Sequence, residues 1–430
     1  MSDAVIDLGE LRDGSDPDPL PRPASRRGRR TRTALVALLV LVGLAASTPY
    51  PRRVGVTLPA TAGADAVVFD DVVFLVEPIG ATRQRTLTAT RVPNGEPVWR
   101  TSLPAEGRYW GVARSGETLL AIGYETGQDG AGTLTIALDP RTGAYRWQQP
   151  GRPAVLPDGA ILLWSAENEA VGALRAVDAC CGTVRWQEPI AAGLDLTLRD
   201  GPRGVDRLVL LRGGGQVEVR ETATGAVLAR ADLPSPPGGT PRVLRVVDDL
   251  LATIDGSPSV ITAYGLDHLD QRWRIPAAGA TFVSDCGVVI CLENENAAGG
   301  RRTIDAATGE PRWEDDRWGW FWPQADRLLA ATQSSSGSAA QDLVVLDPPT
   351  GRVLAKLGRW EIAQYDVDGP LIGVRPHPDG GLLVAELDVR GGTVRMLDVL
   401  RDAAGDCRAA TGLLLCRRRD ADFGLWRLPT

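Results

Sequence analysis

The chain contains very few basic side chains other than arginine. Of its 47 Lys and Arg residues only Lys356 is lysine, and there are two histidines, His268 and His377. A three-histidine metal site within one chain is therefore excluded, and a Schiff-base mechanism has a single candidate lysine. The formal net charge of −7 argues against a general nucleic-acid partner. Serine-hydrolase, Walker A, zinc-protease and EF-hand motifs are also missing.

Glycine and proline are abundant, with 49 and 31 residues, and 43% of the 430 residues are hydrophobic. This composition suits many short strands and turns. The length is enough for a large core, in two or three average domains or in one large repeat fold.

The first 50 residues indicate targeting. Residues 1–32 combine acids with the arginine-rich stretch Arg22–Arg32 and predict a disordered cytoplasmic tail. The uncharged run Thr33–Ser47, extended to Tyr50, is just long enough for a transmembrane helix. The arginines before it would hold the N-terminus in the cytoplasm and place residues 54–430 outside. The alternative is a signal peptide cleaved after Ala45-Ala46-Ser47, which would release a soluble product.

A nine-residue motif repeats along the rest of the chain. It reads Asp139–Trp147 (DPRTGAYRW), Asp178–Trp186 (DACCGTVRW) and Asp305–Trp313 (DAATGEPRW). Looser copies place the glycine position at residues 95, 225, 269, 351 and 392, a spacing of about 42 residues. This period matches the ~40–45 residues of a four-stranded propeller blade.

The residues of the motif suit a tight turn between two strands. The Asp side chain can bond the backbone two residues on, and Gly supplies a positive φ. The Trp would lie on the returning strand, between neighbouring blades. With two further apolar runs ahead of each motif, we predict four strands per blade, A to D from the axis outward, with the motif at the C–D turn.

The motif resembles the PQQ-like β-propeller repeat (pyrroloquinoline-quinone type), and the resemblance covers residues 54–430. It implies an all-β propeller, usually of eight blades. Members include quinoprotein alcohol dehydrogenases, an outer-membrane assembly lipoprotein and envelope propellers without quinone. The composition, rich in Arg, Ala, Gly and Pro, resembles that of an actinobacterium.

Both ends of the repeat region resemble parts of one blade. Residues 406–410, 413–417 and 423–428 read as three strands, and Arg53–Pro59 reads as a lone D strand. Joining them would close the ring. Nine units can then be counted, but about eight is the usual upper limit, so we predict eight blades.

All six cysteines follow the apolar segment, in three near pairs. An even number at short spacing in an exported domain predicts disulfides. Cys286 with Cys291, and Cys407 with Cys416, lie at equivalent A–B hairpins and would staple them. No paired CxxC pattern predicts a zinc site.

The resemblance also implies a quinone-binding site as a candidate. In quinoprotein alcohol dehydrogenases a vicinal disulfide lies against the quinone, whereas Cys180-Cys181 falls in a C–D turn, where a rigid turn or free thiols fit better. Acid–amide clusters at Glu167–Glu169 and Glu293–Asn296 have the oxygen ligands that Ca²⁺ prefers, but they fall in predicted loops. We can match no catalytic residue of that family, and we expect no cofactor, with PQQ and Ca²⁺ as the alternative.

Aromatic residues outside the motif gather just after D strands. They are Tyr109, Trp110, Trp318, Trp320, Trp322 and Trp360. The D–A connections and B–C loops share one face, so these side chains are candidates for a ligand-binding face around the channel mouth. Alternatively, the innermost strands bury them. His268 and His377 are expected in surface turns.

These patterns predict a membrane-tethered, extracytoplasmic propeller that acts as a binding or scaffold module for a protein or cell-envelope ligand. A PQQ-dependent alcohol or sugar dehydrogenase is the alternative. The sequence names no partner.

Overall fold

A computed structural model describes residues 55–69, 71–80, 83–92, 94–127, 130–164, 172–190, 194–212, 215–234, 243–256, 258–294, 301–332, 340–363, 371–410 and 412–429. All of them belong to one compact unit, Arg52–Thr430. Within these ranges the secondary structure consists of 35 β-strands, and no helix there could cross a membrane. The predicted tail and the predicted span at 33–50 lie outside the described residues.

The strands form antiparallel sheets, and each four-stranded sheet corresponds to one predicted blade. The first three blades consist of β2 (Asp65–Phe69), β3 (Val72–Pro78), β4 (Arg85–Arg91) and β5 (Glu96–Ser102); β6 (Gly107–Ser115), β7 (Thr118–Gly127), β8 (Gly130–Leu138) and β9 (Tyr145–Pro150); and β10 (Arg152–Val155), β11 (Ile161–Trp164), β12 (Gly172–Val177) and β13 (Val184–Ile190).

The next three blades repeat this pattern. They consist of β14 (Asp195–Gly201), β15 (Gly204–Leu211), β16 (Gln216–Glu221) and β17 (Val227–Asp232); β18 (Val243–Val247), β19 (Leu250–Asp255), β20 (Val260–Gly265) and β21 (Gln271–Pro276); and β22 (Ala280–Asp285), β23 (Val289–Asn294), β24 (Arg301–Asp305) and β25 (Pro311–Asp315).

The remaining strands form a seven-stranded sheet and a four-stranded sheet. They are β26 (Trp318–Gln324), β27 (Arg327–Thr332), β28 (Gln341–Leu346), β29 (Val353–Ile362), β30 (Leu371–Pro376), β31 (Leu382–Asp388) and β32 (Thr393–Leu400); and β33 (Ala403–Ala410), β34 (Leu413–Arg418), β35 (Phe423–Arg427) and β1 (Val56–Leu58).

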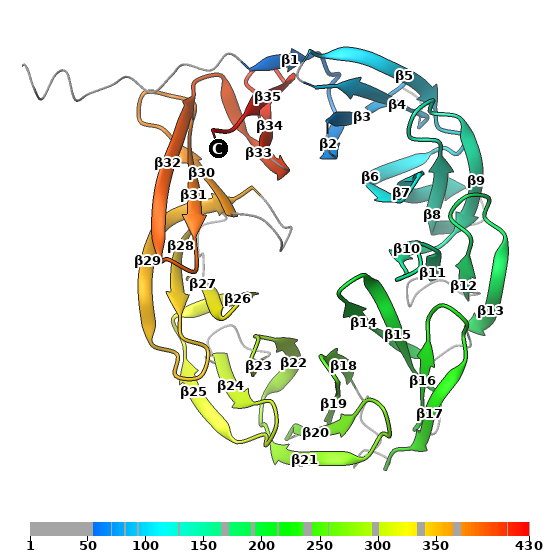
Figure 1. The fold of residues 1–430 in the computed structure, drawn as a ribbon, viewed down its shortest axis with the longest axis vertical. Helices are drawn as coiled ribbons and strands as arrows, with labels where there is room; N and C mark the ends of the chain where they lie inside the picture. Colours follow the sequence, from blue (N-terminus) through cyan, green and yellow to red (C-terminus); the bar gives the residue numbers. More distant parts are fainter. Residues whose placement is uncertain are drawn as a thin grey trace, which may run out of the picture. The chain divides into compact units, whose positions relative to one another are not determined.

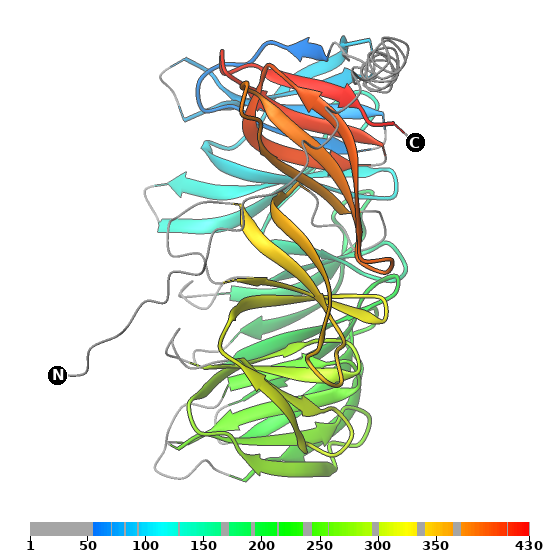
Figure 2. The ribbon, with the colours of Figure 1, turned by 90° about the vertical axis from the view of Figure 1, so that its left-hand side faces the viewer.

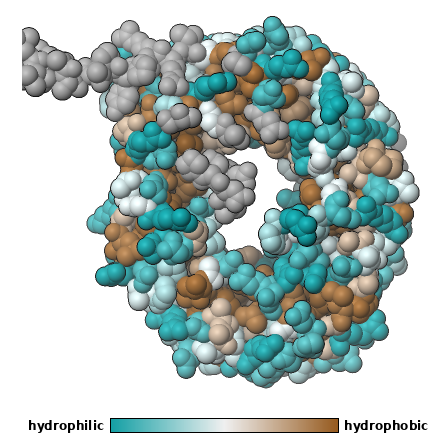
Figure 3. Space-filling model, viewed as in Figure 1, coloured by the Kyte–Doolittle hydropathy of each residue, from teal (hydrophilic) through white to brown (hydrophobic). Residues whose placement is uncertain are grey.

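The sheets of this unit stand side by side in a ring (Figure 1), which confirms the predicted β-propeller. The first strand of each sheet lies toward the centre and the last lies at the outside, as in the predicted A-to-D order. Figure 2 shows the same strands from the side, crossing the thickness of the ring. An opening remains in the middle (Figure 3).

The ring contains nine blades, so the predicted number of eight was wrong. The seven-stranded sheet consists of two blades that share β29. The residues of β29 up to Trp360 pair with β28, whereas Glu361 and Ile362 pair with β30. Gly358, with φ +87°, allows β29 to change direction there. Nine hydrophobic clusters of described residues fill the nine spaces between neighbouring blades, so each blade buries both of its faces.

The two ends of the ring meet in one sheet, as predicted. Strand β1 pairs with β35 through Val56↔Leu425, Thr57↔Gly424 and Leu58↔Phe423. The blade therefore takes three strands from the C-terminal end and its outermost strand from residues near the start of the ring. This pairing satisfies strand edges that would otherwise be exposed.

The repeat motif holds neighbouring blades together, also as predicted. Trp147 on β9 lies over the next C–D turn and donates its Nε1–H to Ala179 O at 2.9 Å. Gly182 in that turn has φ +70°, and a Cβ there would lie 2.7 Å from Cγ of Trp147. Glycine is thus required twice, by the backbone conformation and by the approach of the indole. The same bond to the second residue of the next turn motif, after its Asp or, in one copy, Glu221, recurs at Trp99, Trp186, Trp273 and Trp313.

Disulfides join both predicted A–B hairpin pairs. Cys286 bonds Cys291 across the turn from β22 to β23, and Cys407 on β33 bonds Cys416 on β34. All four cysteines are buried. They belong to the hydrophobic clusters on which the adjoining blades pack, so they act as core residues as well as cross-links.

Candidate ligand-binding site

A pocket of about 420 Å³ lies where β29 passes from one blade to the next. Its lining residues come from the innermost strand β26, from the start of β28 and from the end of β29, and they are Trp320, Phe321, Trp322, Gln341, Leu343, Trp360, Glu361 and Ile362. Strand β28 begins and strand β29 ends at the same end of the blade. The pocket therefore lies at the end that carries the B–C and D–A connections. Its size falls in the range of small-ligand sites.

Strand pairing explains how the aromatic wall forms. Trp320 pairs with Ala331 on β27, and Ala331 pairs with Leu343 on β28, so the three side chains share one face of the sheet. The small Ala331 leaves room for the indole of Trp320 to reach across the sheet. There its Nε1–H donates to Oε1 of Gln341. The ring of Trp322 lies 6.4 Å from that of Trp320, measured between centroids.

The opposite wall comes from the end of β29. Trp360 is buried, and its Nε1–H donates to Leu357 O at 2.8 Å. The guanidinium carbon of Arg375 lies 4.3 Å from the centre of the Trp360 ring. Glu361 is half-buried next to it and is the only carboxylate in the lining. Burial first, and then the charge of Asp406, raise the pKa of Glu361 above its usual range.

The structure separates the six aromatic residues predicted to form one face. Trp320, Trp322 and Trp360 surround the pocket. Trp318 is buried on the opposite side of the same blade, against the Cys286–Cys291 disulfide, because a bulge between Trp318 and Trp320 reverses the alternation of side chains.

A second bulge, between Tyr109 and Gly111, acts in the same way on another blade. Tyr109 is buried, and its hydroxyl donates to Ala105 O at 3.0 Å. Trp110 is half-buried and packs against the exposed Tyr124, with ring centroids 4.3 Å apart and the ring planes tilted by 36°. Tyr109 and Trp318 are therefore core residues, as the alternative interpretation expected.

Of the predicted acid–amide clusters the structure describes only Glu293 and Asn294, and neither lines this pocket. Glu293 forms an ion pair with Arg301 at 2.5 Å, and Asn294 Oδ1 accepts a hydrogen bond from Arg302 at 3.3 Å. Glu167–Glu169, Glu295 and Asn296 lie outside the described residues. His377 lies in the β30–β31 turn, where Nδ1 accepts the backbone N–H of Asp379 at 3.2 Å. His268 lies in the β20–β21 turn.

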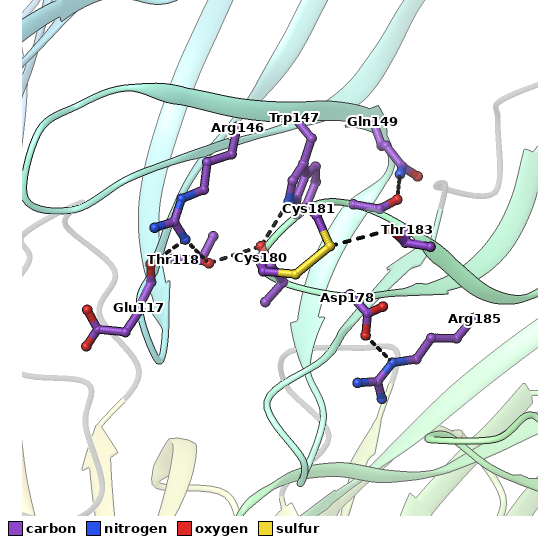
Figure 4. Close-up of a disulfide and its surroundings, with 12 residues drawn as sticks. Glu117, Thr118, Arg146, Trp147, Gln149, Asp178, Cys180, Cys181, Thr183 and Arg185 are labelled. Atoms are coloured by element: carbon purple, nitrogen blue, oxygen red, sulfur yellow. Dashed lines mark hydrogen bonds and ion pairs between the residues drawn. A yellow bond between two sulfur atoms is a disulfide. The ribbon is translucent and has the colours of Figure 1, made fainter.

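Cys180 and Cys181 form a vicinal disulfide in an exposed C–D turn (Figure 4). The turn is anchored by side chains of the preceding blade: Trp147 donates to Ala179 O, and Gln149 Nε2 donates to Gly182 O at 2.7 Å. Elsewhere in the chain Thr142, Thr308 and Thr350 stand where Cys181 stands here. The cysteines are therefore not needed for the turn to form.

The described residues do not fit the quinone site that the resemblance implies. The vicinal cysteines lie in a turn between the two outer strands of a blade, away from the pocket lining. Glu293 is already paired with an arginine. Among the described residues, no three His, Cys, Asp or Glu side chains converge as metal ligands would. We therefore derive no chemical step through a quinone.

Sequence reasoning found the three tryptophans of the pocket but missed Gln341, Leu343, Glu361 and Ile362. Only the strand register places Gln341 beside Trp320, and no local pattern reveals it. The run Trp360-Glu361-Ile362, with a lone carboxylate between two large apolar residues, is the signal that was available.

Residues 83–263 match a PQQ-type family model described as outer membrane protein assembly factor BamB. No curated protein matches the sequence. A solved eukaryotic initiation factor shares the fold, with 10% identity over 79% of this chain and 91% of that chain and a TM-score of 0.52.

Two further similar structures have lower TM-scores. One is BamB from Moraxella catarrhalis, with 16% identity over 66% of this chain and 92% of that chain and a TM-score of 0.40. The other is a quinohemoprotein alcohol dehydrogenase of Pseudomonas putida HK5, with 12% identity over 66% and 62% and a TM-score of 0.38. The family match over residues 83–263, the turn motif and the propeller agree with one another, so the chain is similar to the PQQ-like β-propeller repeat proteins.

Proposed function

We propose that this chain is a binding module that recognises a protein partner of the cell envelope through the pocket formed by Trp320, Trp322 and Trp360. The observation that carries the proposal is the concave shape of this site, which has aromatic walls and two polar groups, Gln341 and Glu361. Tryptophans in such pockets are over-represented among binding hot spots. The match to an outer membrane assembly factor supports a protein as the partner.

The test is capture of the partner from intact envelope. Tagged full-length chain is crosslinked in cells, purified and compared with Trp322→Ala. Removing the half-buried Trp322 is expected to weaken capture by more than about 1 kcal/mol, or at least about fivefold, as for a hot spot.

The matched control is Tyr145→Ala, which removes an aromatic side chain that is 55% exposed on the outer strand β9. It should capture as well as the wild type, and melting curves should show that Trp322→Ala stays folded. Equal capture by wild type and folded Trp322→Ala would refute the proposed site.

The PQQ-dependent dehydrogenase is the rival function. Purified chain is mixed with Ca²⁺ and PQQ, and the quinone absorbance and dye-linked alcohol oxidation are measured. We expect neither a retained quinone band nor alcohol-dependent dye reduction. Either of them would replace the binding-module proposal with an enzyme.

We also propose that residues 54–430 lie outside the cytoplasmic membrane, tethered by residues 33–50. The support is the uncharged run Thr33–Ser47 behind the arginines of Arg22–Arg32. Protease added to intact spheroplasts should digest the propeller and spare the N-terminal tail. A soluble product that begins near Thr48 would instead show a cleaved signal peptide, and a protected propeller would overturn the topology.

A further inference from the structure

Among the described residues Glu361 has no counter-ion, unlike most of the half-buried carboxylates of this protein. Arginines pair with such side chains throughout the propeller. The pairs include Asp139–Arg146 (2.7 Å), Glu188–Arg212 (2.6 Å), Asp206–Arg199 (2.7 Å), Glu293–Arg301 (2.5 Å), Asp315–Arg317 (2.5 Å) and Glu386–Arg395 (2.5 Å). The side-chain carboxylate of Glu361 forms no hydrogen bond or ion pair with any described residue. A carboxylate that is partly removed from water without a partner is costly, so a counter-charge from outside the chain would stabilise it.

The charges around Glu361 favour a cation. The side chain of Asp406 on β33 is 80% exposed, and its charge acts on Glu361 as well. Two cations of the neighbouring strands are already engaged: Arg417 lies 3.5 Å from Asp406, and Arg375 lies over the Trp360 ring. The carboxylate of Glu361 in the lining therefore has a second negative charge near it, that of Asp406, which lies outside the lining.

The aromatic walls act in the same direction. The faces of tryptophan rings carry a negative quadrupole that attracts guanidinium and ammonium groups. Arg375 over Trp360 shows one such contact within this protein. Oε1 of Gln341 accepts the Trp320 N–H and has a second lone pair for an N–H donor in the pocket.

We propose that the pocket binds a cationic side chain, arginine or lysine, of the protein partner, with Glu361 as its counter-ion and Trp320, Trp322 and Trp360 as the surrounding walls. This inference rests on the proposed function. An aromatic pocket with a carboxylate would also suit an uncharged sugar ring, but the missing counter-ion favours the cation, and the sugar becomes an outcome of the test.

The test compares two small probes of nearly equal shape, N-butylguanidinium and N-butylurea, which differ in charge. Binding to the purified full-length chain is measured by tryptophan fluorescence and by titration calorimetry. We expect the guanidinium to bind at least about tenfold more tightly than the urea, as an ion pair in a partly buried site should. Glu361→Gln should bring the two affinities within about threefold of each other, and Glu310→Gln, in an exposed turn, should change neither.

Glu361→Gln should also leave the protein folded. Since burial disfavours the charged carboxylate, the neutral amide should keep or raise the melting temperature, whereas a purely structural Glu361 would lower it. Equal binding of the two probes by wild type, or a tenfold preference that survives Glu361→Gln, would overturn the inference. So would tighter binding of maltose than of N-butylguanidinium.

The two proposals fail in different ways. If Trp322→Ala loses partner capture but the wild type shows no charge preference, the binding site stands and the cationic ligand is wrong. If the guanidinium preference holds but Trp322→Ala captures the partner fully, the pocket binds a cation that does not come from the partner protein. The proposed function would then be wrong, and so would the assignment of the cation to a partner's side chain.

Discussion

Replacing Trp147 by alanine is expected to destabilise the propeller by about 3–5 kcal/mol, the usual cost of truncating a buried tryptophan. Trp147 is 6% exposed and packs between two blades. Its loss would leave a cavity over Gly182 and remove the hydrogen bond to Ala179 O. The effect should appear as a lower midpoint in thermal and denaturant unfolding.

Tyr145 provides the matched control, two residues earlier on the same strand. Its side chain is 55% exposed, so Tyr145→Ala should change stability by no more than about 0.5 kcal/mol. Similar losses in the two variants would mean that the motif tryptophan does not hold the blades together.

Glu218→Gln is expected to cost about 3 kcal/mol at neutral pH. The Glu218 side chain is 2% exposed and forms ion pairs with Arg220 and Arg230 at 2.6 Å and with Arg212 at 3.3 Å. Removing one charge from a buried network leaves the others uncompensated. Glu310→Gln, in an exposed turn, should be neutral.

The same carboxylate makes stability depend on pH. Burial alone would raise the pKa of Glu218, but hydrogen bonds from Arg220 and Arg212 outweigh it and lower the pKa to about 2. Because this lies below the ordinary value of 4.5, the stabilisation is complete above pH 4.5 and is lost as the pH falls toward 2. Between these pH limits, the free energy of unfolding measured with denaturant should fall less steeply for Glu218→Gln than for the wild type. Parallel pH profiles for wild type and variant would contradict the assignment.

The blade fold was predictable because its signals are local. The turn from Asp139 to Trp147 contains its own hydrogen-bonding side chain, its positive-φ glycine and its docking tryptophan within nine residues. Closure was predictable because Arg53–Pro59 resembles an outermost strand with no blade of its own. The number of blades was not predictable. We preferred the typical upper limit of eight blades to the nine units that can be counted in the sequence, and the sharing of β29 between two blades depends on its bend at Gly358.

The pocket was only partly predictable, because it depends on two features that a sequence does not display. The bulge between Trp318 and Trp320 decides which tryptophans face the pocket, although simple alternation would place all three together. The pairing register brings Gln341 beside Trp320 across an intervening strand. Glu361 acquires its significance only from the absence of a partner among the described residues, which is a property of the folded chain.

Site-specific photo-crosslinking tests the central claim, recognition through the pocket, most directly. A diazirine amino acid of leucine-like size replaces Ile362 in the pocket lining, or Leu354, which is 38% exposed on the same strand. After illumination of intact cells, the account predicts one crosslinked protein from position 362 that is lost with Trp322→Ala, and none from position 354. Crosslinks to the same protein from position 354 alone, or from both positions with no effect of Trp322→Ala, would contradict it.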